Sequence, residues 1–156
     1  MSKILPWTVL IGLATVLLTI SFSQPHLLND QNAFLKEFIS EQLLATLGFI
    51  LTVTLASAAN LHLELNKIED QTGKKFARTR KSVRRSAYSL MALFAAATLL
   101  VIVKPLLPSP PPYNTAVANS LAVLILCFNL SVLYDLTRTV FAIPSISQIK
   151  AMDSEG

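Results

Sequence analysis

Four long apolar runs dominate the hydropathy pattern of this chain, and none of them contains Asp, Glu, Lys or Arg. Each run is 18 to 22 residues long. At about 1.5 Å per residue, a helix of this length matches a hydrocarbon layer of about 30 Å. A soluble helix is rarely apolar on every face. The pattern therefore predicts an all-α, polytopic membrane protein, one domain over residues 1–156, with four transmembrane helices. We place the spans at about residues 4–23, 41–63, 86–103 and 116–137.

The first run also has a feature of a cleaved signal peptide, because Ser21-Phe22-Ser23 follows the small-x-small pattern of a cleavage site. Two features favour a retained helix. The apolar stretch is longer than a usual signal core, and its leader holds a single basic residue, Lys3. We expect residues 4–23 to remain as the first helix, with a cleaved signal as the alternative.

The segment between the second and third runs is the most basic part of the chain. Residues 64–85 hold eight of the 13 Lys and Arg. Leu65 and Ile68 continue a helical pattern beyond the second run, Gln71-Thr72-Gly73 favours a turn, and Val83 belongs to a returning helix. We predict a cytoplasmic helical hairpin over about residues 61–85. A solvated loop is the alternative to a surface that binds a protein partner or anionic lipid. The basic residues of that surface are Lys74, Lys75, Arg78, Arg80, Lys81, Arg84 and Arg85.

The distribution of basic residues predicts the orientation. With four spans, eleven Lys and Arg fall on the side of the hairpin and two, Lys36 and Lys104, fall on the other side. Positive charge collects on the cytoplasmic side of membrane proteins. We therefore expect a multi-pass protein with both termini in the cytoplasm.

The remaining segments connect or follow the spans. Residues 29–40 predict an amphipathic helix at the outer interface, with Asn29 and Asp30 as candidate caps and a possible direct continuation into the second span. The outer loop, residues 104–115, contains five of the eight prolines, which favours a stiff spacer over a proline-recognition motif. Residues 142–156 predict a short cytoplasmic tail.

Small residues recur in the second span at steps of three or four, a pattern that lets another helix approach closely. The stripe serves either packing within the chain or association between chains. Its members are Ala45, Gly48, Thr52, Ala56 and Asn60.

Neutral polar groups occur inside the fourth span as well. Asn129 lies in the apolar run, where an amide requires a partner from protein or water. Asn60 and Asn129 either tie helices together or line an oligomeric pore. Asp135 and Arg138 are three residues apart and predict an ion pair at the inner boundary.

The sequence contains no recognisable catalytic or cofactor-binding pattern. Cys127 is the single cysteine, and His26 and His62 are predicted on opposite sides of the membrane, so neither a metal site nor a cofactor is expected. The basic segment lacks the interleaved aromatics of a surface that stacks bases, so we expect no nucleic-acid binding. Because no span has an acidic residue at its middle, a proton-coupled efflux transporter is disfavoured. We expect a protein that is not an enzyme.

Three features resemble the small four-helix membrane components of bacterial phage-exclusion and abortive-infection systems, the Rex membrane-protein type. They are the Ala/Thr/Ser-rich stretch LTVTLASAAN, the Arg-rich loop that runs into Ala87-Tyr88, and the segment from Leu133 to Arg138 that reads LYDLTR. This chain differs in its proline-rich outer loop and its longer tail. The resemblance implies an inner-membrane protein that oligomerises and disturbs ion gradients when a cytoplasmic sensor signals infection. No set of functional residues transfers from it.

We therefore expect a self-associating bacterial inner-membrane protein that engages a cytoplasmic partner through its basic hairpin, as the membrane component of an anti-phage defence system. One alternative is an oligomeric ion channel. Another is an accessory subunit of a larger membrane complex.

Overall fold

The computed structural model describes residues 4–73, 75–107 and 112–141, and these residues form helices and no strand. The all-α prediction is confirmed for this part of the chain. Lys3, Lys74, the prolines within 108–111 and the predicted tail lie outside the described residues. The helices are α1 (Ile4–Ser23), η1 (Pro25–Leu27), α2 (Ala33–Glu37), η2 (Phe38–Gln42), α3 (Leu43–Thr72), α4 (Ala77–Val103), η3 (Lys104–Leu106) and α5 (Tyr113–Phe141).

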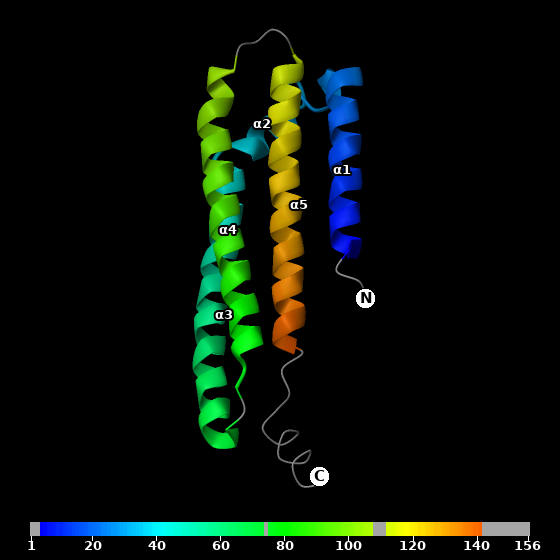
Figure 1. Cartoon of the computed structure of the whole chain (residues 1–156). Helices are drawn as coiled ribbons and strands as arrows, with labels where there is room; N and C mark the ends of the chain where they lie inside the picture. Colours follow the sequence, from blue (N-terminus) through cyan, green and yellow to red (C-terminus); the bar gives the residue numbers. More distant parts are fainter. Residues whose placement is uncertain (1–3, 74, 108–111, 142–156) are drawn as a thin grey trace.

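The long helices run side by side in an elongated bundle (Figure 1). α5 packs between α1 and α4, and α3 packs against α4. The turn between α3 and α4 lies at one end of the bundle, and the connection from α1 to α2 lies at the other end. The chain thus has two chemically distinct ends joined by apolar helices.

Three helical segments are long and apolar enough to cross a membrane: Ala33–Gln71, Ala77–Leu106 and Tyr113–Phe141. Within the apolar windows of the first two, only 17% of the residues are buried inside the chain. Most of their apolar surface therefore faces outward, which soluble monomers rarely tolerate over such an area. α1 contributes a shorter apolar stretch, Trp7–Ser23. These helices are compatible with a membrane protein, and the four-span count stays a prediction.

The buried core lies where α2, η2 and the first turns of α3 meet α4 and α5. Leu43 and Leu47 are fully buried there, beside Ala97 and Ala122. Small alanines on α4 and α5 leave room for the leucines of α3, which is why the three helices pack closely at this level.

The segment before α3 differs from the predicted interfacial helix over residues 29–40. α2 begins only at Ala33, where the side chain of Asn32 accepts a hydrogen bond from the backbone N–H of Leu35 at 3.3 Å. The chain then bends, because Ile39 and Ser40 have non-helical backbone angles. The Ser40 hydroxyl donates to the carbonyl of Glu37, an alternative to regular helix bonding. The bend buries Ile39, which is 2% exposed, in the core.

α3 continues far beyond the second apolar run, and the cytoplasmic hairpin stays a prediction. α3 ends at Thr72, and Gly73 follows in the left-handed conformation with φ 67°. The Gly73 N–H donates to the carbonyl of Glu69 at 2.8 Å. This closing arrangement favours glycine, since a Cβ is disfavoured at positive φ. α4 starts four residues later, at Ala77.

Candidate functional site

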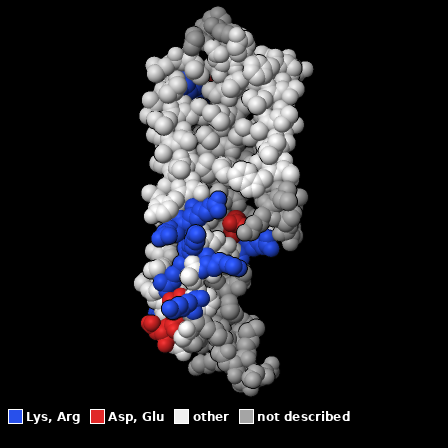
Figure 2. All heavy atoms as spheres, in the orientation of Figure 1, with Lys and Arg blue, Asp and Glu red and all other residues white. Residues whose placement is uncertain are grey.

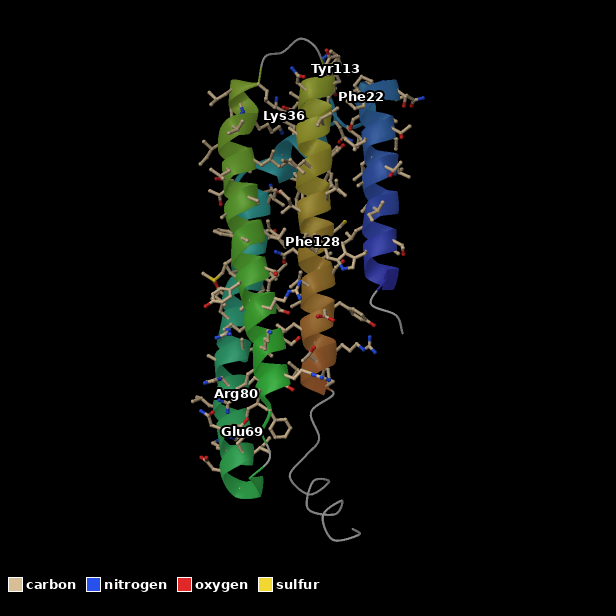
Figure 3. All side chains as sticks on the ribbon, viewed as in Figure 1. Phe22, Lys36, Glu69, Arg80, Tyr113 and Phe128 are labelled. Atoms are coloured by element: carbon tan, nitrogen blue, oxygen red, sulfur yellow. The ribbon has the colours of Figure 1, made fainter. Side chains whose placement is uncertain are left out.

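An ion pair joins the end of α3 to the start of α4. The Arg80 guanidinium donates from Nη2 to Glu69 Oε2 at 2.7 Å and to Asn66 Oδ1 at 2.5 Å. The other carboxylate oxygen, Glu69 Oε1, accepts the backbone N–H of Phe76 at 2.6 Å. Figure 3 shows Glu69 and Arg80 together at the end of the bundle where the two helices meet. Arg80 was predicted as a binding residue, but its charge is already engaged within the chain.

Most of the other described basic residues near this turn are exposed and have no ion-pair partner among the described residues. On the face seen in Figure 2, Lys and Arg gather toward one end, below a broad region almost without charged side chains. Lys67 is exposed but pairs with Glu64 at 2.8 Å. Five further exposed basic residues near the turn form no ion pair with another described residue. We call them the free basic surface: Lys75, Arg78, Lys81, Arg84 and Arg85.

Two hollows adjoin the free basic surface. A groove of about 670 Å³ lies between α3 and α4, with Leu61 and Leu65 on one side and Lys81 and Arg84 on the other. A shallower hollow of about 480 Å³ lies on α4 beside Tyr88 and is lined by the same Lys81 and Arg84. These two cations therefore border both hollows.

The small-residue stripe of α3 faces outward for most of its length. Ala45, Thr52, Ala56 and Asn60 are exposed. Gly48 alone meets another helix, since a Cβ placed on it would lie 3.5 Å from the ring of Phe94. The sequence left open whether the stripe packs against another helix of the same chain. In the structure most of the stripe is exposed and makes no such packing contact.

The two polar side chains of this stripe differ in their hydrogen bonding. The Thr52 hydroxyl donates to the carbonyl of Gly48 at 2.9 Å, within its own helix. The Asn60 amide is exposed and forms no side-chain hydrogen bond among the described residues. Two large apolar side chains of α3 are exposed as well, Phe49 at 72% and Leu63 at 58%.

Asn129 lies in the interior of the bundle and not on an open face. Its side chain is 1% exposed, and its Oδ1 has no hydrogen-bond partner among the described residues. Asp135 and Arg138, the predicted pair at the inner boundary, are both exposed and no ion pair joins them.

A polar cluster at the opposite end of the bundle was not predicted. The Lys104 ammonium lies 2.8 Å from Asp30 Oδ1, and the Asn119 amide donates to the same oxygen at 3.1 Å and to the carbonyl of Leu28 at 2.8 Å. Lys104 is 9% exposed and Asn119 is fully buried. The cluster ties the connection after α1 to η3 and α5. One residue of the sequence could have indicated this cluster. Lys104 is the single charged residue of the loop over residues 104–115, so an acidic partner had to come from another segment.

The pKa of Asp30 reflects two opposing effects. Burial alone would raise the pKa of this carboxyl, but hydrogen bonds from Lys104 and Asn119, together with the positive charges of Lys104 and Lys36, lower it below its usual value. Asp30 is therefore ionised at neutral pH and forms a true ion pair with Lys104.

A hydroxyl pair joins α1 to α5 beside this cluster. Ser21 Oγ lies 2.7 Å from Ser120 Oγ and donates to the carbonyl of Leu17 at 2.8 Å. Both serines are buried. At the other end of α1, the Trp7 ring lies 5.6 Å from that of Phe128 on α5. α1 is thus held to α5 at two levels.

Metal-ligating residues do not cluster in the part of the chain that the structure describes: it contains no group of three or more His, Cys, Asp or Glu able to hold an ion. Cys127 is a free, half-buried thiol on α5. Comparison with protein-family models, with curated proteins and with solved structures finds no match for this chain.

Proposed function

We propose that this chain is a non-enzymatic protein of the bacterial inner membrane that self-associates through the exposed stripe of α3 and engages a cytoplasmic partner through its free basic surface. In this proposal α1 is a fourth span, both termini are cytoplasmic, and the α3–α4 turn is the tip of a cytoplasmic hairpin. The bias of eleven basic residues against two supports this orientation.

The single observation that carries self-association is the exposure of Ala45, Thr52, Ala56 and Asn60 on one face of α3. Small side chains in a membrane helix allow close backbone approach, and the resulting van der Waals contact drives association. The free Asn60 amide adds a hydrogen bond with a second copy, a contact that contributes about 0.5–2 kcal/mol in membrane helices.

The fit of α1 to α5 supports the fourth span. α1 has 20 residues, enough for about 30 Å at the helical rise. It contacts α5 through the Trp7 and Phe128 rings and through the Ser21 and Ser120 hydroxyls. Away from α5 it exposes large apolar side chains such as Ile11 at 63%. That surface is suited to lipid.

Charge supports the role of the hairpin in binding a partner. The ion pair between Glu69 and Arg80 orders the turn, and the free basic surface projects beside it without counter-charges from the described chain. Complementary charge steers association and selects the partner. An acidic protein surface fits this chemistry, and the resemblance to Rex-type components makes an infection sensor of a phage-defence system our proposed partner.

The mass of the chain in mild detergent tests self-association. We expect a particle containing at least two copies of the 17.0 kDa chain. Ala56→Ile places a bulky branched side chain in the stripe and should shift the particle toward monomer. Ala96→Ile makes the same change at an exposed position of α4 and should leave the particle unchanged. A wild-type protein that is strictly monomeric at all concentrations defeats the proposal.

Phage challenge tests the partner and defence roles. Cells that carry the gene in its native chromosomal setting should lose protection when Lys75, Arg78 and Arg85 are all changed to Gln. The conservative set Lys75→Arg, Arg78→Lys and Arg85→Lys keeps the charge and should retain protection. If deletion of the whole gene leaves plaquing efficiency unchanged for every phage tried, the defence role is wrong.

A further inference from the structure

The groove between α3 and α4 combines an apolar lining with two cations. Along α3 it is lined by Ala58, Leu61 and Leu65. Along α4, Lys81 and Arg84 border it between Ala77 and Ala87. The small side chains of Ala58 and Ala87 line this hollow, whose volume is about 670 Å³. This volume lies within the usual range of small-molecule sites.

The cations of the groove are available for a ligand. Arg80 also borders the groove, but Glu69 and Asn66 hold its guanidinium. Lys81 and Arg84 have no hydrogen bond or ion pair with any described residue. The groove therefore offers two uncompensated positive charges above an apolar floor.

The position of Tyr88 places these charges at the level of lipid headgroups. Tyr88 is 63% exposed and lines the adjoining hollow together with Lys81 and Arg84. It lies one turn beyond Arg84, about 6 Å along the helix, on the side of the apolar run. Exposed tyrosines are typical of the membrane–water interface, with basic residues just outside it. Ala58 and Leu61 then lie toward the hydrocarbon.

We propose that this groove binds an anionic phospholipid. Lys81 and Arg84 contact the phosphate, and an acyl chain follows the floor formed by Ala58, Leu61 and Ala87. Charge complementarity and the apolar lining beside the two cations favour a lipid over a soluble anion, which needs no apolar floor. The inference rests on the proposed function for its cytoplasmic orientation. It assigns Lys81 and Arg84 of the free basic surface to the lipid and leaves Lys75, Arg78 and Arg85 for the protein partner.

The test titrates the full-length protein in neutral detergent with dioleoylphosphatidylglycerol and counts bound lipid by native mass spectrometry. We expect retention of phosphatidylglycerol and none of phosphatidylcholine with the same chains. Lys81→Gln with Arg84→Gln should weaken binding about 30-fold, which corresponds to about 2 kcal/mol for two interfacial cations. Lys75→Gln with Arg78→Gln removes the same charge from exposed positions outside both hollows. Binding should change less than about 3-fold in this control, because neither cation contacts the lipid.

Two further arms separate the lipid from other occupants. Ala59→Leu narrows the groove at an exposed position without a change of charge and should weaken lipid binding, whereas Ala96→Leu on the outer face of α4 should not. Glycerol 3-phosphate and polyglutamate should fail to displace the lipid. Equal retention of phosphatidylcholine, equal loss in both charge variants, or displacement by either soluble anion overturns the proposal.

The lipid measurement can fail or succeed separately from the self-association that the proposed function includes. A monomeric particle that still selects phosphatidylglycerol contradicts self-association and leaves the lipid site standing. An intact oligomer without lipid selectivity contradicts the lipid site and leaves self-association standing. Circular dichroism confirms that each variant is folded, and a variant with reduced helix content is replaced by Lys81→Met or Arg84→Met at the same site.

Discussion

Replacing Asp30 with Asn should destabilise the end of the bundle opposite the α3–α4 turn. Lys104 is 9% exposed and lies 2.8 Å from Asp30 Oδ1, so the substitution leaves a buried ammonium without a counter-charge. Removing one partner of a fully buried pair costs about 3–5 kcal/mol. The Asp30 side chain is 36% exposed, so water screens the interaction. We therefore expect a loss of about 2 kcal/mol.

Thermal unfolding in detergent measures this loss. A free-energy change of 1 kcal/mol shifts the Tm of a chain of this size by about 2–4 °C, so Asp30→Asn should lower the Tm by about 4–8 °C. Fluorescence of Trp7 is a suitable signal, because it is the single tryptophan and packs against Phe128 on α5. Helix content at 222 nm serves as a second signal.

Two variants control this prediction. Glu41→Gln makes the same chemical change at an exposed carboxylate and should leave the Tm within about 1 °C, as surface substitutions usually do. Asp30→Asn combined with Lys104→Met removes both charges and should recover more than half of the loss, because no ammonium remains unpaired. The reasoning is refuted if Asp30→Asn costs no more than Glu41→Gln, or if the double variant is as unstable as the sum of the single ones.

Four more predictions concern this ion pair and three other sites of the structure. Folding lowers the pKa of Asp30, so ionised Asp30 contributes to the free energy of unfolding above the carboxyl pKa of the unfolded chain. This contribution is lost as the pH falls through the pKa of the folded chain. The difference in Tm between wild type and Asp30→Asn should therefore disappear well below about pH 4. Ser21→Ala should cost about 0.5–1.5 kcal/mol in thermal unfolding, because it breaks the link to Ser120, whereas Thr15→Ala removes only a bond within α1 and should cost less. Arg80→Gln should speed hydrogen exchange over residues 64–85 by about tenfold, since it frees Glu69, while Arg78→Gln should not. Asn60→Leu should shift the detergent particle toward monomer without lowering the monomer's Tm, because Asn60 has no partner among the described residues; an unchanged oligomer would contradict this.

The helices could be predicted from local sequence because the length of an apolar run, its hydrophobic period and its charge are properties of consecutive residues. Uncharged runs of about 20 residues satisfy their backbone groups in lipid only as helices, so their composition indicates both the element and its environment. The spacing of Leu65 and Ile68 likewise predicted that α3 continues past the apolar run, and Gly73 marked its end. The start of α2 was not predicted correctly. The sequence suggested Asn29 and Asp30 as caps, whereas the Asn29 side chain accepts the N–H of Gln31 and Asn32 caps α2.

The sequence by itself determined which segments are apolar and helical and in which segment the basic residues gather. Only the tertiary structure decided which neighbours each helix face meets. The stripe on α3 has the same spacing whether it is covered or free, and its exposure depends on how α4 lies against α3. Lys104 and Asp30 become partners because η3 and the segment before α2 meet beside the first turns of α5. Arg80 is likewise engaged because the end of α3 brings Glu69 to it. Periodicity describes one helix at a time, whereas contacts between distant segments arise from packing. Only the fold therefore shows which predicted binding residues are exposed and which already bind another residue of the chain.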